Sequence, residues 1–195
     1  SHFLLRTDKN RLIALLRFSQ TIYLLRGQDF FRIFQFAPGQ YEMTLHYRDN
    51  VVKAADDLMR LKRIVRMNAR AHGVTACFMA KPNENYAGSG MHLHISMQDA
   101  AGRNVFVEAV EGQWSDTIKH AIGGLRATMG ESMLVFAPHA NSWRRFASAV
   151  YSPADDTWGV ENRTVALRVP GGSAKARHFE HRVAGVDANP YLVAA

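Results

Sequence analysis

The stretch GSGMHLHISMQ at residues 88–98 decides the fold predicted for this chain. Side chains alternate across a β-strand, so His92 and His94 point to one face while Met91 and Leu93 point to the other. The glycines at the start of the stretch let the backbone approach a ligand closely. The stretch therefore predicts a half-buried strand with one face for packing and one face for chemistry.

Two further stretches repeat this alternation. In APGQYE at 37–42, Gln40 and Glu42 share one face of an extended run, and in HFEHR at 178–182, Glu180 and Arg182 share one face. Carboxylates, imidazoles and guanidiniums are the groups that hold divalent metal and phosphate. Each residue also has an ordinary interpretation, as a solvent-facing histidine or as the glutamate of a surface salt bridge.

Apolar spacing and turn residues give the other elements. Helices are predicted at 8–27, 49–72 and 114–129. Extended segments are predicted at 30–47, 74–80, 91–98, around 163–169 and around 178–183, with a hairpin that turns back into 104–107. Together these elements predict an α+β fold. Its sheet is mostly antiparallel, with helices packed on one face and the functional residues on the other.

Composition limits the classes of protein that the chain can form. With 195 residues, of which 47% are hydrophobic, it can bury one substantial core. No apolar run is long enough for a membrane span, and the first residues lack the pattern of a secretory signal, so we expect a cytoplasmic protein without a membrane partner. The single Cys77 excludes an internal disulfide and is expected in the core.

The formal net charge of +7 raises the alternative of nucleic-acid binding. The arginines, however, are spread over the chain and interleaved with acidic residues. None of the motif spacings of common nucleic-acid modules is present. We therefore expect no nucleic-acid partner and interpret the basic residues as a pocket for a polyanionic small molecule.

Five ordered motifs carry a resemblance to a known family. They are APGQYE at 37–42, KPN at 81–83 followed by GSGMHLH, NSWRRF at 141–146, WGVENRTVALRVP at 158–170 and RHFEHRVAGVDANPYL at 177–192. Over about residues 30–195 they resemble the catalytic domain of the glutamine synthetase family. The last two motifs are most similar to the branch of γ-glutamylpolyamine synthetases, which join glutamate to amines other than ammonia.

The resemblance implies a curved, mostly antiparallel sheet and an ATP-dependent ligase. An amine or ammonia would be joined to the γ-carboxylate of glutamate through a γ-glutamyl phosphate intermediate, with Mg²⁺ or Mn²⁺ as cofactor. The chemistry depends on charge neutralisation more than on covalent participation of the protein. The family also implies a homo-oligomer.

The resemblance implies a role for each residue that matches a family motif. The metal ligands would be Glu42, His92 and Glu180. The glutamate substrate would be held by Arg145, Arg182 and the backbone of Gly88. Arg163 and Arg168 would be catalytic and stabilise the moving phosphoryl group, while His94, Ser96 and Lys175 would line the nucleotide site.

The chain also departs from the family pattern. Gln35 stands where a metal-binding glutamate is expected, Ser1 where a second is expected, and Ala87 where an asparagine is expected. Tyr151 replaces the glutamate that ammonia-using members carry, which favours an organic amine. We expect residues 1–195 to form a single partial catalytic domain without the family's N-terminal β-grasp-like domain and final helices. A catalytically impaired nucleotide- or metabolite-binding protein is the alternative.

Overall fold

The computed structural model describes residues 13–25, 35–37, 40–108, 114–147 and 151–195. These residues form one sheet with the strand order β2-β3-β1-β5-β8-β7-β6, and β4 pairs with β1 beside this path. The strands are β1 (Ile13–Leu25), β2 (Gln35–Ala37), β3 (Gln40–Thr44), β4 (Thr75–Cys77), β5 (Met91–Gln98), β6 (Trp158–Val160), β7 (Leu167–Val169) and β8 (Phe179–His181). The helices are α1 (Val51–Ala71), α2 (Asp116–Thr128), α3 (Met133–Phe136), α4 (Ala140–Ala147) and α5 (Pro190–Ala194), with a short 3-10 helix at Ala174–Ala176.

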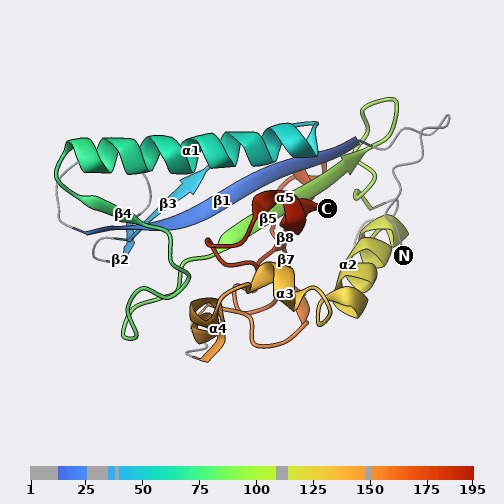
Figure 1. The fold of residues 1–195 in the computed structure, drawn as a ribbon. Coiled ribbons are helices and arrows are strands. Elements are labelled where there is room, and N and C mark those ends of the chain that lie inside the picture. The colour runs from blue at the N-terminus through green and yellow to red at the C-terminus, as the bar shows by residue number, and fades with distance from the viewer. Residues whose placement is uncertain (1–12, 26–34, 38–39, 109–113, 148–150) are drawn as a thin grey trace.

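The sheet is mostly antiparallel, as predicted. Among the described strands only β6 and β7 pair in parallel, and the pairing path from β2 to β6 does not close into a barrel. Figure 1 shows α1 running along the sheet, with the long strand β1 beneath it. The fold is therefore the predicted α+β class.

The helix predicted at 8–27 is wrong, because residues 13–25 form the strand β1. This strand pairs with β5 from Ile13↔Gln98 to Gln20↔Met91, and with β3 from Ser19↔Thr44 to Tyr23↔Gln40. Residues 13–25 hold two short apolar runs separated by Arg17 and the polar residues 19–21, and apolar runs of this length fit helical and strand spacing alike, so periodicity cannot separate the two. Pairing on both edges decides the outcome, and the remaining residues of the predicted helix lie outside the described ranges.

The two other predicted helices are confirmed. Helix α1 begins after Asn50, whose Oδ1 accepts a hydrogen bond from the Lys53 backbone N–H at 2.9 Å. Helix α2 begins after Ser115, whose Oγ accepts from the Ile118 N–H at 3.3 Å. Gly73, with φ +70°, follows α1 in the left-handed conformation that favours glycine. The side chains of Asn50 and Ser115 therefore set where these two helices begin.

The predicted strands are confirmed in place but are shorter, except for β5, which spans residues 91–98 as predicted. The return strand of the hairpin at 104–107 does not form; only a single bridge joins Gln98 to Asn104. The Asn104 side chain accepts from the Phe106 N–H and donates to the Arg177 carbonyl at 2.7 Å, which turns the chain away from β5. Cys77 is half-buried in β4 instead of lying in the core.

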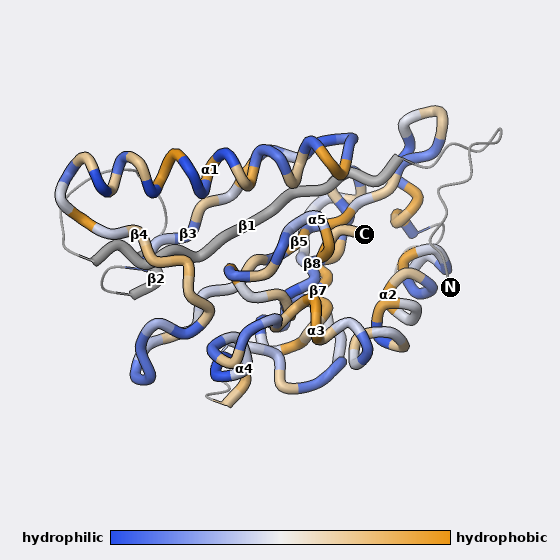
Figure 2. Tube along the Cα trace, viewed as in Figure 1, coloured by the Kyte–Doolittle hydropathy of each residue, from blue (hydrophilic) through white to orange (hydrophobic). Residues whose placement is uncertain are grey.

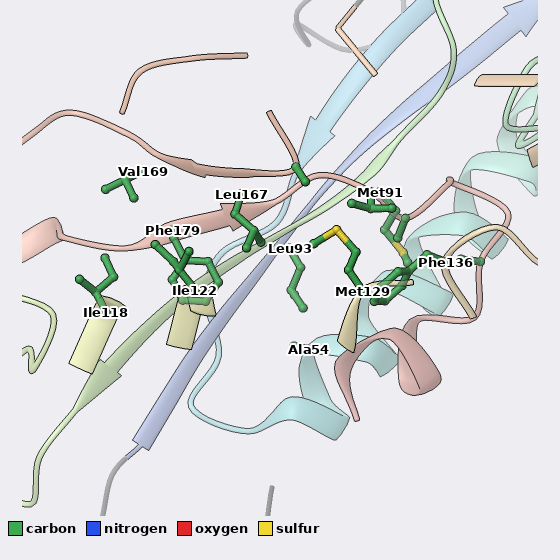
Figure 3. Close-up of a cluster of buried hydrophobic side chains, with 14 of the residues drawn as sticks. Ala54, Met91, Leu93, Ile118, Ile122, Met129, Phe136, Leu167, Val169 and Phe179 are labelled. Carbon is green, nitrogen blue, oxygen red and sulfur yellow. The ribbon is translucent and has the colours of Figure 1, made fainter. Parts of the chain in front are cut away.

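The core lies on one face of the sheet, between the strands and the two long helices. Met91 and Leu93 of β5 join one hydrophobic cluster with Leu58 of α1 and with Ile118 and Ile122 of α2. Figure 3 shows the α2 isoleucines beside Phe179 of β8. Figure 2 shows hydrophilic and hydrophobic residues alternating along α1, as expected for a helix with one packed face. The histidines of β5 are left on the opposite face.

None of the helices in the described residues combines the length and the apolar character that a membrane crossing requires.

Lys62 ties α1 to the segment that follows β8. Its side chain is buried, lies over the ring of Phe78, and donates from Nζ to the Val186 carbonyl at 2.7 Å. Burial lowers the pKa of Lys62 to about 8, an effect that Arg66 increases and Asp187 opposes. The charged form of Lys62 is therefore disfavoured in the folded chain.

The Lys62→Met variant tests this buried amine. Between pH 8 and the ordinary lysine value of 10.5 the unfolded chain binds more protons, so the free energy of unfolding should rise with pH, by roughly 3 kcal/mol at most. Urea unfolding across this window should show the rise in the wild type and not in Lys62→Met. Lys53 is exposed, so the control variant Lys53→Met should show the same rise in the free energy of unfolding as the wild type. An equal rise in all three proteins would contradict the prediction.

Candidate active site

A cleft of about 200 Å³ opens on the polar face of the sheet. It brings together nine of the residues singled out from sequence: Glu42, Gly88, His92, His94, Arg145, Arg163, Arg168, Glu180 and Arg182. They come from β3, the loop before β5, β5 itself, α4, and the region of β6 to β8. Segments far apart in the sequence therefore place carboxylates, imidazoles and guanidiniums on one surface.

Glu180 is the centre of charge in this cleft. It lies on β8 and is 3% exposed. Its Oε1 accepts from Arg182 Nη1 and from His92 Nδ1, both at 2.8 Å, and its Oε2 accepts from Arg168 Nη1 at 3.1 Å. Burial would raise the pKa of Glu180, but the hydrogen bond from His92 and the charge of Arg182 hold the pKa well below its ordinary value. The carboxylate is therefore ionised at neutral pH.

His92 shares this environment. Burial lowers the pKa of His92, and the hydrogen bond to Glu180 only partly opposes the effect. Because the ionised carboxylate of Glu180 can only accept, the imidazole proton lies on Nδ1, and Nε2 carries the lone pair. A Cβ at Gly90 would lie 2.8 Å from this Nε2, so glycine is needed here for the imidazole to fit.

Arg182 connects Glu180 to the rim of the cleft. Its Nη2 donates to the carbonyls of Arg163 at 3.0 Å and Tyr151 at 3.3 Å. Tyr151 adopts φ +63°, a left-handed conformation that is unfavourable for a residue with a Cβ. Its side chain is about half exposed at the cleft. The arginine therefore holds two rim segments at fixed distances from the buried carboxylate.

Arg145 enters the cleft from α4 and is 3% exposed. Its Nη1 donates to the Val183 carbonyl at 2.8 Å. Burial lowers the pKa of Arg145 to about 10, with Asp187 opposing the effect, so the side chain remains a cation at neutral pH. A Cβ at Gly88 would lie 2.7 Å from the Cγ of Arg145, so glycine lets the loop backbone pass beside the arginine.

The loop before β5 is fixed from two sides. The Lys81 backbone N–H donates to Asn141 Oδ1, and Asn141 Nδ2 donates back to the Lys81 carbonyl, both at 2.8 Å. From the sheet, Gln40 Nε2 donates to the carbonyls of Ala87 at 3.4 Å and Gly88 at 3.2 Å. The Gly88 backbone is therefore held in place before any ligand binds.

A second cavity of about 760 Å³ adjoins the first. Ser96 and Lys175, both predicted to line the nucleotide site, lie here and not in the first cleft, and His94 lines both. The rings of His94 and His178 lie 5.3 Å apart, and Tyr47 adds an aromatic side chain. The structure thus divides the predicted residues between two connected spaces.

The three predicted metal ligands line one cleft without forming a cage. No group of three His, Cys, Asp or Glu side chains in the described ranges could hold a metal ion as arranged. His92 and Glu180 form a hydrogen-bonded pair, and Glu42 lies on the neighbouring wall. Oxygen and imidazole ligands suit Mg²⁺ and Mn²⁺, and Mg²⁺ usually binds one or two carboxylates together with water and substrate phosphate. The donor chemistry fits that mode of binding.

Several residues of the site had no role in the sequence interpretation. The alternation of its strand places Gln40 on the polar face, but neither the pattern nor the resemblance assigns it a role. Glu161 lies in the ENR part of a motif, yet its contact with Arg168 depends on a turn that no spacing reveals. The four residues that differ from the family pattern do not all lie at the site. Ala87 and Tyr151 line the cleft, Gln35 begins β2, and Ser1 lies outside the described residues.

Known proteins resemble this chain over most of its length. A family model described as glutamine synthetase, catalytic domain, matches residues 30–195. γ-Glutamylputrescine synthetase PuuA of Escherichia coli strain K12 is 51% identical over 159 residues, which make up 82% of this chain and 34% of that protein. Glutamate–isopropylamine ligase of a Pseudomonas species is 39% identical, over 81% of this chain and 34% of that protein.

A third relative, γ-glutamylethanolamide synthetase GlnA4 of Streptomyces coelicolor, is 39% identical over 81% of this chain and 33% of its own length. The chain thus spans about a third of the length of these relatives. A solved structure described as "Apo GmaS without ligand" matches with a TM-score of 0.77 at 25% identity, over 94% of this chain and 52% of the other. The structural match agrees with the predicted fold.

Replacing the buried carboxylate tests its place at the centre of the cleft. Glu180→Gln leaves the buried charge of Arg182 without its carboxylate and leaves Arg168 with Glu161 alone, which should lower the free energy of unfolding by about 3–5 kcal/mol. Asp116→Asn, at an exposed carboxylate paired with Lys119, should change it by less than about 0.5 kcal/mol. Urea unfolding measures both, and similar losses in the two variants would contradict the account.

Proposed function

The chain belongs to the glutamine synthetase family, and from that premise we propose that its cleft joins the γ-carboxylate of glutamate to an organic amine with ATP. The names of three relatives, which specify the synthesis of γ-glutamylputrescine, the ligation of glutamate with isopropylamine and the synthesis of γ-glutamylethanolamide, support a glutamate–amine ligase. The observation that carries the proposal is the convergence of Arg145, Arg163, Arg168 and Arg182 on one cleft.

Arg145 and Arg182 would bind the carboxylates of glutamate. Both are buried cations, and each has an Nε atom that is buried without a hydrogen-bond partner in the described structure. A planar guanidinium matches a carboxylate with two parallel hydrogen bonds. The fixed backbone of Gly88 would lie beside the bound amino acid and limit its orientation. These groups bind the substrate and take no proton from it.

Arg163 and Arg168 would stabilise the phosphoryl group during its transfer from ATP to the γ-carboxylate. Transfer spreads negative charge over the phosphoryl oxygens, so fixed cations lower the barrier more than they lower the energy of the ground state. The amine then attacks the carbonyl carbon of the γ-glutamyl phosphate, the bond from this carbon to the phosphate oxygen breaks, and inorganic phosphate leaves. The nitrogen loses a proton as the amide forms, and the departing phosphate accepts it.

The second cavity would hold the nucleotide. His94, Ser96 and Lys175 line it, and Lys175 provides a cation for phosphate. Because His94 belongs to both spaces, the phosphate chain would pass this residue on its way to the arginines. The larger volume suits the nucleotide, while the smaller cleft suits an amino acid.

Enzymes of this family use divalent metal together with ATP. A Mg²⁺ or Mn²⁺ ion, when bound, would neutralise phosphate charge. Glu42, His92 and Glu180 would be its ligands, with Glu180 exchanging its present hydrogen bonds for the cation. We further propose that residues 1–195 act as part of a catalytic domain. The homo-oligomer and cytoplasmic location implied by the resemblance remain predictions.

The alternative is a nucleotide- or metabolite-binding protein that no longer catalyses ligation. Gln35 and Ala87 replace side chains that the family pattern places near the metal and the glutamate, and this favours the alternative. Both functions predict that ATP binds. Only the ligase predicts phosphate release that requires glutamate and an amine together.

Phosphate release across a panel of amines tests the ligase. We expect release that depends on ATP, glutamate and an amine, and a loss of about a hundredfold in kcat in Arg163→Ala. Arg126→Ala, which removes a surface arginine paired with Asp156, should retain activity. ATP binding by calorimetry without release would favour the binding protein, and full activity of Arg163→Ala would contradict the mechanism.

Tyr151 at the rim should determine the choice of amine. An aromatic ring can contact an organic cation through its face, whereas a carboxylate attracts the small ammonium ion. Tyr151→Glu should raise the ratio of kcat/KM for ammonia to that for an organic amine by at least about tenfold, which corresponds to about 1.4 kcal/mol. Tyr151→Phe keeps the ring and should keep the wild-type ratio. An unchanged ratio in Tyr151→Glu would place amine selection elsewhere.

A further inference from the structure

Glu161 lies just outside the cleft, at the residue after β6, and contacts a residue inside it. Its Oε2 accepts from Arg168 Nη2 at 2.9 Å. Its Oε1 accepts from the backbone N–H of Gly171, in the turn that follows β7. Both carboxylate oxygens are thus used, one for the arginine and one for the turn. Hydrogen bonds from Gly171 and Arg168 lower the pKa of Glu161, which keeps this exposed carboxylate ionised.

The backbone at Glu161 is held in an unfavourable conformation. Its φ is +53°, in the left-handed region where a residue with a Cβ is strained. Its N–H donates to the Val169 carbonyl at 3.1 Å, a bond that glycine would make equally well. Glycine would adopt this backbone conformation without the strain. The carboxylate is therefore kept at a cost in backbone energy.

Arg168 is shared between two carboxylates. Its Nη1 donates to buried Glu180 at 3.1 Å, and its Nη2 donates to Glu161 at the rim. Glu180 also accepts hydrogen bonds from Arg182 and His92. Any ligand that recruits the Glu180 oxygens weakens the hold of Glu180 on Arg168. Glu161 does not line the cleft, so a ligand in the cleft does not compete directly for the Glu161 oxygens.

We propose that Glu161 is a positioning residue that fixes the Arg168 guanidinium when the cleft is occupied. The inference rests on the proposed function, in which Arg168 meets the transferred phosphoryl group. With Nη2 held from outside, Nη1 can leave Glu180 and meet the phosphoryl oxygens without a search through other side-chain conformations. Fixing a group in advance of the reaction lowers the barrier without strengthening the binding of the ground state.

A purely structural role would make Glu161 a clamp between the ends of β6 and β7. The two roles differ in what a glycine at this position does. Glu161→Gly relieves the left-handed strain and should not lower the melting temperature, but it removes the carboxylate from Arg168. A clamp predicts a lower melting temperature in this variant, whereas positioning predicts a stable chain with an unrestrained arginine.

The test compares Glu161→Gln, Glu161→Gly and Glu161→Asp with the wild type. Nitrogen-15 spectra of the arginine side chains are recorded with glutamate and a non-hydrolysable ATP analogue, and Arg168→Lys identifies the Arg168 signals. They should show separate Nη resonances in the wild type and averaged ones in the Gln and Gly variants. In the ligase assay, kcat should fall about tenfold in both, with the KM values for ATP and glutamate within twofold of the wild type. Glu161→Asp should recover part of kcat.

Separate Arg168 resonances in both the Gln and Gly variants, or an unchanged kcat in both, would overturn the proposal. A lower melting temperature in Glu161→Gly, together with a lower kcat and raised KM values, would identify a structural clamp instead. The spectra require no turnover. If the wild type releases no phosphate, the proposed function fails while the resonances still decide whether Glu161 fixes Arg168.

Discussion

The buried carboxylate of Glu180 is the constraint on which the rest of the site depends. A charge that is 3% exposed must be compensated, and here Arg168, Arg182 and His92 share that task. The sheet register places these partners: Glu180 lies opposite His94 of β5 and opposite Arg168 of β7. Pairing of three strands therefore creates the charge cluster, and the cluster in turn fixes the rim segments around it.

The two faces of the sheet divide stability from chemistry. On one face, Met91 and Leu93 pack against α1 and α2, which gives the strands a rigid support. On the other, the alternate residues of the same strands line the cleft. Since adjacent side chains on a strand point in opposite directions, each functional residue of β5 has apolar neighbours that hold it in place, and Glu180 of β8 lies between buried Phe179 and buried His181. The support of the site is thus part of the same local sequence.

Sequence reasoning succeeded where a local pattern was sufficient. The alternation in β5 gave its bounds and its two faces, and the spacing of apolar residues located α1 and α2. It failed for β1, where the apolar runs suit either element and pairing with distant strands decides. It also missed the role of Glu161, because the left-handed backbone and the approach to Arg168 depend on a turn between strands. Ser96 and Lys175 carry one predicted role, and only the structure shows that they line a second cavity beside the cleft.

In the proposed reaction, the arginine-lined cleft transfers a phosphoryl group from ATP to glutamate. Glutamate labelled with oxygen-18 in its γ-carboxylate tests this directly when it is supplied with ATP and an amine. We expect one labelled oxygen in each inorganic phosphate released, because that oxygen bridges carbon and phosphorus in the γ-glutamyl phosphate. Phosphate released without the label, while the γ-glutamyl amide accumulates, would contradict the account.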